Sequence, residues 1–297
     1  MKKNKKNNKP QQEFVRRSVM QEVWRNYRKS FGAMLGLIII ALIIAIGIWG
    51  NIHYDYESQV ILQDIPNARQ APSVEHWFGT DEFGRDIFTR VIYASRYSIT
   101  IAFVSVIIST CLGVTLGALA GYYGGLLDTI IMRITDVFGS LPAVLFGMTI
   151  VAAFGQNIGV LMIALAISGT PAIVRVSRAS VMQVRGQEFV EAAKATGVRD
   201  PAIIFGHVLP NALSPILVQC TLRIGTAITG IATLSFLGMG VSAPMPEWGA
   251  MLSGGRAYIR GYSYMTLFPG LAIMLTVLGF NLIGDGLRDA MDPKLKK

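Results

Sequence analysis

Long stretches without charged residues are the feature that most constrains how this chain can fold. A helix needs about 20 mostly apolar residues to cross the hydrocarbon core of a bilayer. Stretches of that size lie at 30–54, 97–127, 137–174, 212–246 and 261–284. The fourth of them holds a single charged residue, and the others hold none. Charged residues make up only 15% of the 297 residues, against roughly 25% in soluble domains. The sequence therefore predicts an all-α membrane protein and excludes a soluble or disordered chain.

The third of these stretches is long enough for two helices joined by a turn near 155–157, so six transmembrane helices are expected. Their expected bounds are 31–50, 98–121, 138–154, 158–175, 213–239 and 265–284. The apolar region of a signal peptide runs to only about 7–15 residues and ends at a small-residue cleavage site. The first stretch is longer and has no such site after it, so we expect it to be retained as a membrane span.

Lysine and arginine are divided unequally between the two sides of this arrangement. With the N-terminus inside, twenty of the 27 lie in inner segments and six in outer segments. Because basic residues accumulate in cytoplasmic loops, both termini are expected in the cytoplasm. The predicted parts are a basic cytoplasmic tail, a first transmembrane helix, an extracytoplasmic segment, a five-helix core with a cytoplasmic loop, and a cytoplasmic C-terminus. They are assigned to residues 1–30, 31–50, 51–97, 98–284 (with the loop at about 176–212) and 285–297.

The tail at 1–30 holds ten basic residues and two glutamates. Such a segment is typical of a topogenic signal that also contacts anionic lipid, at about 1 kcal/mol per basic residue near the surface. A nucleic-acid-binding arm is the alternative. Because the positive charge is concentrated beside the first predicted span, the lipid interpretation is favoured, and no nucleic-acid partner is expected.

Motifs for catalysis or for a bound cofactor are missing from the sequence. It has no G-x-x-x-x-G-K-[ST] phosphate loop and no Gly-Lys pair. A G-x-G-x-x-A match at 238–243 follows a predicted membrane span, whereas a dinucleotide fingerprint follows a strand and opens a helix. His53, His76 and His207 are scattered without metal-ligand spacing. We therefore expect that the chain is not an enzyme and binds no cofactor or metal itself.

Three glycines, Gly113, Gly117 and Gly121, recur at every fourth position of the second predicted span. This spacing lets helix backbones approach closely. The favoured interpretation is helix packing, within this chain or against a partner, rather than ligand binding.

Arg223 lies about ten residues into the fifth predicted span, where a charge costs a few kcal/mol. Two interpretations are open. In the first, Arg223 lines a pore and faces a substrate carboxylate. In the second, it has a structural partner or extends back toward the inner surface.

The longest inner loop has the pattern of a helix, a glycine turn and a second helix. Residues 185–197 are predicted as a short helix that ends at Gly197, which suits the left-handed position just after a helix C-terminus. Asp200 then suits an N-cap, and Pro201 suits the first helical position. A second short helix is expected to follow and to end before Leu209-Pro210.

This loop resembles a known family. The triplet Glu191-Ala192-Ala193, followed by Gly197 and by Leu209-Pro210, is similar to the EAA loop of ABC-importer permeases. In that family the loop docks a short coupling helix into a groove of a separate ATPase subunit. The resemblance implies that coupling to the ATPase rests on Glu191, Ala192, Ala193, Gly197, Asp200, Pro201, Leu209 and Pro210.

Three further segments narrow the resemblance to one subfamily. Residues 78–86 resemble the G-T-D-E-x-G-R-D motif of dipeptide and oligopeptide permeases. Residues 234–249 and 280–293 resemble the outer segment after the fifth span and the C-terminus of the same permeases. The resemblance covers nearly everything after residue 20 and points to the C-type subunit of the permease pair. It implies a type I ABC importer permease fold and transport by alternating access.

The resemblance also implies the partners. These are a homologous second permease, two ATPase subunits that bind ATP and Mg²⁺, an extracytoplasmic substrate-binding protein and the lipid bilayer. Di- or oligopeptides are the expected substrates, with nickel or glutathione as alternatives within the subfamily. An ion-coupled carrier or a channel is the rival from another class. Since the predicted spans contain no Asp or Glu, a proton relay is poorly supported, and energy is expected from a partner that hydrolyses ATP.

Overall fold

The structure, a computed structural model, describes residues 19–291. Most of the predicted basic tail and the Asp292-Pro293 pair lie outside the described residues. Within 19–291 the elements are helical, with one isolated β-bridge between Thr80 and Asp86. The helices are α1 (Val19–Tyr27), α2 (Phe31–His53), α3 (Ile87–Tyr123), α4 (Gly125–Ser140), α5 (Ala143–Phe154), α6 (Ile158–Arg185), α7 (Glu188–Ala195), α8 (Asp200–Ile203), α9 (Leu209–Phe236), α10 (Trp248–Gly255) and α11 (Tyr264–Met291). Short π-helical turns lie at Tyr56–Val60 and Ile204–Val208, and short 3₁₀ turns at Ile65–Asn67 and Arg256–Tyr258.

Five helical segments of the described chain are long and apolar enough to cross a membrane. They are α2, α3, α6, α11 and the continuous run from α8 through α9. The pair α4 and α5 passes the same test together, although the two helices meet at 87°. The expected all-α architecture is therefore confirmed, with five spans, or six where the bent pair is taken as one.

The prediction of a continuous third span at 138–154 is wrong. Helix α4 ends at Ser140, and α5 begins only at Ala143. Leu141, between them, has an extended backbone (φ −82°, ψ 132°). The cause is Pro142, because a proline disfavours the helical conformation of the residue before it. The apolar composition continues across this break, so hydropathy alone does not detect it.

Helix α3 begins eleven residues earlier than the expected start at residue 98. Asp86 is its N-cap, and its carboxylate accepts a hydrogen bond of 2.8 Å from the backbone N–H of Thr89. Asp, with its short acceptor side chain, is among the favoured N-cap residues. Part of the segment predicted as an outer loop is therefore the first three turns of a membrane helix.

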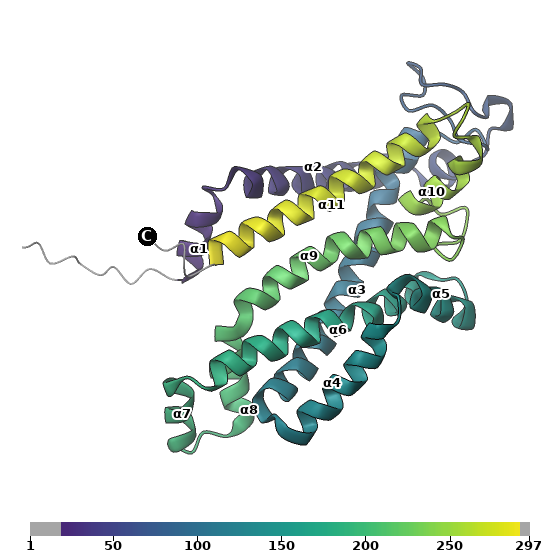
Figure 1. Cartoon of the computed structure of the whole chain (residues 1–297). Helices are drawn as coiled ribbons and strands as arrows, with labels where there is room; N and C mark the ends of the chain where they lie inside the picture. Colours follow the sequence, from purple (N-terminus) through teal and green to yellow (C-terminus); the bar gives the residue numbers. More distant parts are fainter. Residues whose placement is uncertain (1–18, 292–297) are drawn as a thin grey trace, which may run out of the picture.

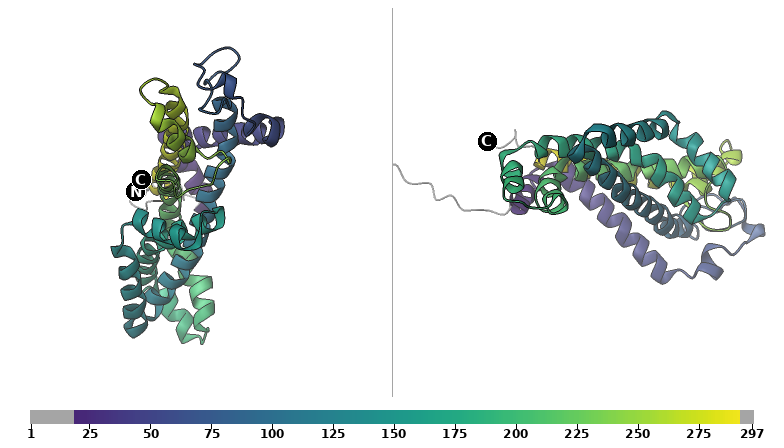
Figure 2. Two further views of the ribbon diagram at one scale, coloured as in Figure 1. Left: turned by 90° about the vertical axis from the view of Figure 1, so that its right-hand side faces the viewer. Right: turned by 90° about the horizontal axis from the view of Figure 1, so that it is seen from below.

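The helices run roughly lengthwise through an elongated bundle (Figure 1). One end carries α1, the end of α11 and the loop with α7 and α8, while the other end carries residues 54–86 and α10. Helix α9 lies between α6 and α11 and contacts both. Two further views place α2 on one flank and α4 on the other (Figure 2). The α7–α8 loop therefore projects from the same end at which the described chain begins and finishes.

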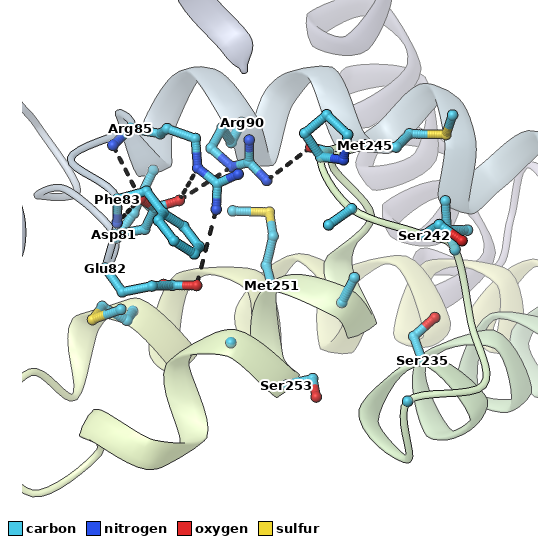
Figure 3. A pocket seen from close by; sticks show the side chains of 18 of the residues that line it. Asp81, Glu82, Phe83, Arg85, Arg90, Ser235, Ser242, Met245, Met251 and Ser253 are labelled. Atoms are coloured by element: carbon cyan, nitrogen blue, oxygen red, sulfur yellow. Dashed lines mark hydrogen bonds and ion pairs between the residues drawn. The ribbon is translucent and has the colours of Figure 1, made fainter. Parts of the chain in front are cut away.

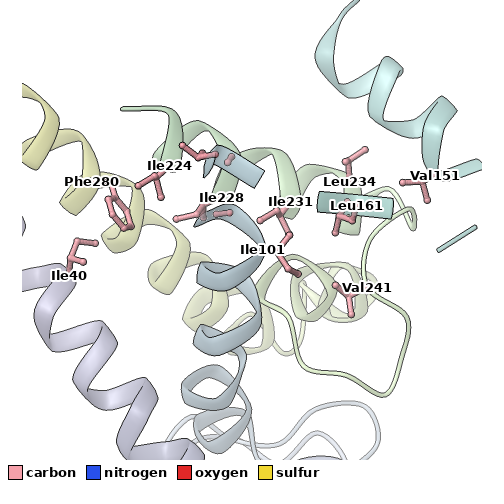
Figure 4. Close-up of a cluster of buried hydrophobic side chains, with 13 residues drawn as sticks. Ile40, Ile101, Val151, Leu161, Ile224, Ile228, Ile231, Leu234, Val241 and Phe280 are labelled. Atoms are coloured by element: carbon pink, nitrogen blue, oxygen red, sulfur yellow. The ribbon is translucent and has the colours of Figure 1, made fainter. Parts of the chain in front are cut away.

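The largest apolar core lies along α9 (Figure 4). Ile228, Ile231 and Leu234 of α9 are each at most 1% exposed. They pack in one cluster with Ile101 of α3 and Leu161 of α6. Burying a large aliphatic side chain contributes about 1.5–3 kcal/mol relative to water. Since lipid tails are as apolar as leucine, close packing is what favours these contacts over lipid in a membrane.

The glycine repeat of the second span packs α3 against α6, as expected. A side chain at Gly113 would lie 2.7 Å from Ile173, and one at Gly117 would lie 2.6 Å from the backbone oxygen of Val174. At Gly121 it would lie 2.7 Å from a backbone oxygen of α6. Distances below about 3.0 Å cannot be accommodated without a backbone shift. Helices α3 and α6 therefore form one closely packed pair, which leads directly into the α7–α8 loop.

Candidate functional site

The turn after α7 has the geometry that the sequence predicts. Gly197 has φ +78°, in the left-handed region. The N–H of Val198 donates to the C=O of Ala193 at 3.2 Å, and the N–H of Gly197 donates to that of Lys194 at 3.0 Å. These are the two bonds of a Schellman motif. A Cβ at Gly197 would meet nothing within 4 Å, so glycine is needed there for its backbone conformation and not for space.

The N-cap prediction for Asp200 is wrong by one position. Arg199 is the N-cap of α8, Asp200 is its first residue, and Pro201 follows as the second. The Asp200 carboxylate is used differently, because it accepts a hydrogen bond of 2.7 Å from the hydroxyl of Tyr122 at the end of α3. Asp200 thus joins the loop to a membrane helix.

The second helix of the loop does not end before Leu209-Pro210 as expected. Helix α8 passes through a π-helical turn and continues directly into α9. In that turn the N–H of Leu209 donates to the C=O of Ile204, five residues back. Pro210 has no N–H and its ring crowds the preceding turn of a regular α-helix. The wider turn relieves this conflict, so the loop is a rigid extension of α9.

Tyr122 is a functional candidate that sequence reasoning missed. Besides the bond to Asp200, its backbone C=O accepts a hydrogen bond of 2.9 Å from Arg185 at the end of α6. The ammonium of Lys194 lies 5.0 Å from the centre of its ring, within the range of a cation–π contact. One residue of α3 therefore holds α6, α7 and α8 together. The available signal was an aromatic residue with a polar tip at the inner end of a predicted span.

The loop also has a small apolar core of its own. Val190 of α7, Ile203 of α8 and Val208 of the π turn are 0% exposed. They pack with buried residues of α3 and α6. Ala193 packs against this core, whereas Ala192 is exposed. The two alanines of the motif therefore face different surroundings, and Ala192 is the more accessible of the two to another molecule.

The outer surface of the loop carries exposed apolar side chains. Phe205 is 73% exposed, and Phe189 and Val198 are also exposed. Glu191 is exposed, and its carboxylate makes no hydrogen bond or ion pair with the described residues. Sequence reasoning placed Phe205 on a helix but gave it no role. Exposed apolar and aromatic side chains on a projecting loop are typical of a docking surface rather than of a solvated loop.

Arg223 packs toward α3 and α6. A Cβ at Gly169 of α6 would collide with its guanidinium and would lie 3.0 Å from the hydroxyl oxygen of Ser109 on α3. The guanidinium therefore occupies the space that Gly169 leaves. The Nε of Arg223 and the hydroxyl of Ser109 are both shielded from solvent and have no hydrogen-bond partner within the described chain. A structural ion-pair partner for Arg223 is not found among the described residues, and its pore-lining role stays a prediction.

Two cavities lie at opposite ends of the bundle. At the α7–α8 end, a cavity of about 650 Å³ opens between α6, α9 and α11. At the other end, a cavity of about 350 Å³ lies between the start of α3, the segment after α9, and α10.

The second cavity is bordered by charged side chains that pair with one another (Figure 3). Arg85 Nε donates to Asp81 Oδ2 at 2.7 Å, and the Nε of Arg90 lies 3.5 Å from the same oxygen. Arg90 also donates to the backbone C=O of Val60 at 2.7 Å. Nearby, the buried carboxylate of Glu247 caps α10 and accepts two backbone N–H bonds of 2.9 Å. These charges hold the outer-end segments together.

Solved structures show which fold the protein has. The chain superposes on structures of the MetNI methionine ABC transporter in inward-facing conformations with TM-scores of 0.57 and 0.56. At 17% identity, the first match covers 68% of this chain and 97% of that one. A likeness of this kind shows the fold, which is the type I ABC importer permease fold. Together with the long apolar helices, this fold makes the protein a multi-pass, all-helical membrane protein.

Sequence relatives identify the family. Residues 113–297 match the family described as the binding-protein-dependent transport system inner membrane component. Residues 18–72 match the N-terminal transmembrane domain of oligopeptide transport permease C. The chain is 47% identical over 288 residues to the dipeptide transport system permease protein DppC of Alkalihalophilus pseudofirmus, covering 97% of this chain and 94% of the relative. It is 41% identical to the glutathione transport system permease protein GsiD of Pectobacterium atrosepticum, covering 94% and 93%. The chain belongs to this family and is a permease subunit of an ABC importer of the cell membrane, related to the dipeptide and glutathione permeases.

Proposed function

We propose that this chain carries di- or oligopeptides across the cytoplasmic membrane by alternating access, driven by separate ATPase subunits that bind ATP and Mg²⁺. The observation that carries the proposal is the α7–α8 loop, which is internally packed, tied to α3 and exposes an apolar surface. The 47% identity to a dipeptide permease supports the substrate class. Glutathione, itself a tripeptide, is the alternative substrate, because a glutathione permease is 41% identical.

In this proposal the exposed surface of the loop docks into an ATPase subunit. Phe205 and Ala192 supply the apolar contact, and the Glu191 carboxylate is free to accept a hydrogen bond from the partner. Gly197 sets the turn between the two short helices. Asp200 and Pro201 begin the second helix, while Leu209 packs on the loop core and Pro210 sets the π turn into α9. Because the loop continues directly into α9 and is bonded through Tyr122 and Arg185 to α3 and α6, a displacement by the ATPase is transmitted to these membrane helices.

The remaining partners follow from the family relation. A homologous permease would complete the path through the membrane, and an extracytoplasmic binding protein would deliver the substrate to the end that carries residues 54–86. The α7–α8 end and both termini would then be cytoplasmic. A cysteine in place of Asn67 should react with a membrane-impermeant thiol reagent in intact cells, and one in place of Gln21 should not. Labelling at position 21 from outside would reverse this orientation.

The coupling role is tested by adding bulk to the exposed face of the loop. Ala192→Trp should leave the chain inserted and paired with the second permease, but should reduce co-purification of the ATPase subunits and peptide uptake in the same cells. Val74→Trp is the matched control, because Val74 is 93% exposed at the opposite end. It should retain the ATPase subunits. Normal ATPase retention and normal uptake in Ala192→Trp would show that this loop is not the transmission element.

A further inference from the structure

The cavity at the α7–α8 end has an unusual polar lining. It extends along one face of α9 for about three turns, where Asn211, Pro215, Val218 and Leu222 follow one another at helical spacing. Its volume of about 650 Å³ lies within the range of small-molecule sites, roughly 300–1,000 Å³. The polar side chains that line it are Gln183, Gln187, Asn211, Ser214, Gln219 and Arg288. Four of these six are carboxamides, contributed by two membrane helices and the residue that precedes α7.

These carboxamides are largely free. The side chains of Gln183, Gln187 and Gln219 make no hydrogen bond with any described residue. Asn211 donates from its amide nitrogen to the C=O of His207 at 2.7 Å, which leaves its carbonyl oxygen available. Gln183, Gln187 and Asn211 are exposed and Gln219 is partly buried, so their unused donors and acceptors are open to a molecule that enters the cavity. Four such carboxamides around one cavity fit a ligand that both donates and accepts hydrogen bonds.

The cavity carries a single charge among the described residues that line it. Arg288, near the end of α11, is exposed and forms no ion pair within the described chain. Arg223 does not line this cavity, because its guanidinium lies against Gly169. Its neighbour Leu222 lines the cavity instead. A ligand here would meet neutral hydrogen-bonding groups and one guanidinium.

We propose that this cavity binds the main chain and the C-terminal carboxylate of a short peptide, as a release-side subsite for the transported substrate. A carboxamide presents an N–H donor and a C=O acceptor in one plane, which matches a peptide group. Arg288 presents a planar fork of donors that suits a carboxylate. Because the carboxamides are uncharged, this subsite is indifferent to the side chains of the peptide. The inference rests on the proposed peptide-import function and assigns residues to its inner end.

The test uses the complex with its permease and ATPase partners in lipid nanodiscs, without the binding protein. Saturation-transfer NMR would report weak binding of trialanine to the wild type. Gln219→Leu and Gln183→Leu should each weaken binding about threefold to tenfold, the effect of one lost hydrogen bond. Gln21→Leu, an exposed carboxamide on α1, is the matched control and should bind as the wild type does. Gln187 is left unchanged because it is the N-cap residue of α7.

A second arm removes the ligand's charge. Trialanine amide should bind the wild type about tenfold more weakly than trialanine, and Arg288→Gln should bind the two equally. A structural role for Arg288 would lower both affinities and leave their ratio unchanged, which would overturn its assignment. Equal trialanine binding by Gln219→Leu, Gln183→Leu and Gln21→Leu, or none by the wild type, would overturn the subsite.

Uptake by proteoliposomes with the binding protein separates this inference from the function on which it rests. Wild-type uptake of trialanine together with unchanged NMR binding across the variants would refute the subsite and leave peptide import standing. Uptake of nickel but of no peptide would refute both.

Discussion

The two ends of the bundle treat their polar side chains in opposite ways. At the end formed by residues 54–86 and α10, charged side chains are buried and partnered: Asp81, Arg85 and Arg90 are 7%, 7% and 4% exposed. At the α7–α8 end, the Glu191 carboxylate and the Arg288 guanidinium are exposed and make no ion pair within the described chain. The outer end thus pairs these three charges on folding, whereas the inner end leaves the Glu191 carboxylate and the Arg288 guanidinium for other molecules.

This difference separates what each end contributes. Buried charges are costly unless they are paired and hydrogen-bonded, so the outer-end charges act on the stability of the chain itself. Exposed groups at the inner end contribute little to stability, and their effects should appear in assembly and transport. Substitutions at the two ends should therefore separate into stability changes and functional changes.

The largest effect is expected at Asp81. Its carboxylate accepts bonds from the Arg85 Nε at 2.7 Å and from the backbone N–H groups of Phe83 and Arg85 at 2.9 and 3.0 Å. Asp81→Ala would leave two buried guanidinium groups without their carboxylate, at a cost of about 3–5 kcal/mol. Thermal unfolding of the purified chain should show a large fall in melting temperature. Glu191→Ala is the inner-end control and should melt as the wild type does; if the two variants melted alike, the contrast between the ends would fail.

A smaller effect, confined to assembly, is expected at Phe205. Because its side chain is 73% exposed, Phe205→Ala should not change the melting temperature. An aromatic anchor at the centre of an interface is commonly worth about 2 kcal/mol or more, so the affinity for the ATPase subunits should fall at least tenfold. Phe154→Ala is the matched control, since Phe154 is 74% exposed at the end of α5. Its complex should retain the wild-type affinity. Equal affinities for both variants would remove Phe205 from the docking surface.

An effect of about 1–2 kcal/mol is expected at Gly197. The residue has φ +78° and open space around it, and a left-handed conformation costs other residues about 1–2 kcal/mol. Gly197→Val should tilt α7 and lower peptide uptake per ATP hydrolysed several-fold, while membrane insertion stays normal. Gly197→Asn should restore most of the coupling, because asparagine adopts this conformation more readily. If Gly197→Asn were as defective as Gly197→Val, backbone strain would not be the cause.

Much of the fold follows from the sequence because the membrane imposes a simple requirement on length and charge. The requirement says nothing about backbone breaks, so Pro142 divides a stretch that hydropathy presents as uniform. Hydropathy also counts arginines against a membrane helix, so it misses the start of α3, which contains Arg90. In the fold, Arg90 donates to the backbone C=O of Val60 and pairs with Asp81. The first error arises from a local backbone effect that hydropathy ignores, and the second from contacts that a short window of sequence does not contain.

The loop was more predictable than the groups around it. Gly197 could be assigned because one backbone conformation excludes nearly every other residue type. Tyr122 and the cavity-lining residues Gln183, Gln219 and Arg288 come from four helices far apart in sequence, so no spacing connects them. The different environments of Ala192 and Ala193 depend on which face of a short helix meets the loop core. That packing exists only once α3, α6 and α9 have come together.

No loss of stability is expected at Arg223, although it too is a charged residue away from water. Unlike Asp81, it has no ion-pair partner in the described chain, so its removal leaves no charge unpaired. Arg223→Leu should therefore leave the melting temperature unchanged or raise it, because replacing a buried charge with an apolar side chain is often neutral or favourable. Assembly should be intact. If Arg223 lines the transport path, uptake rates or the preference between peptides of different charge should change in proteoliposomes. Normal uptake of every tested substrate would assign Arg223 to the packing of α3, α6 and α9. An unpaired charge would then have a structural role in the middle of the bundle, and the link between unpaired charges and function would hold only for the inner end.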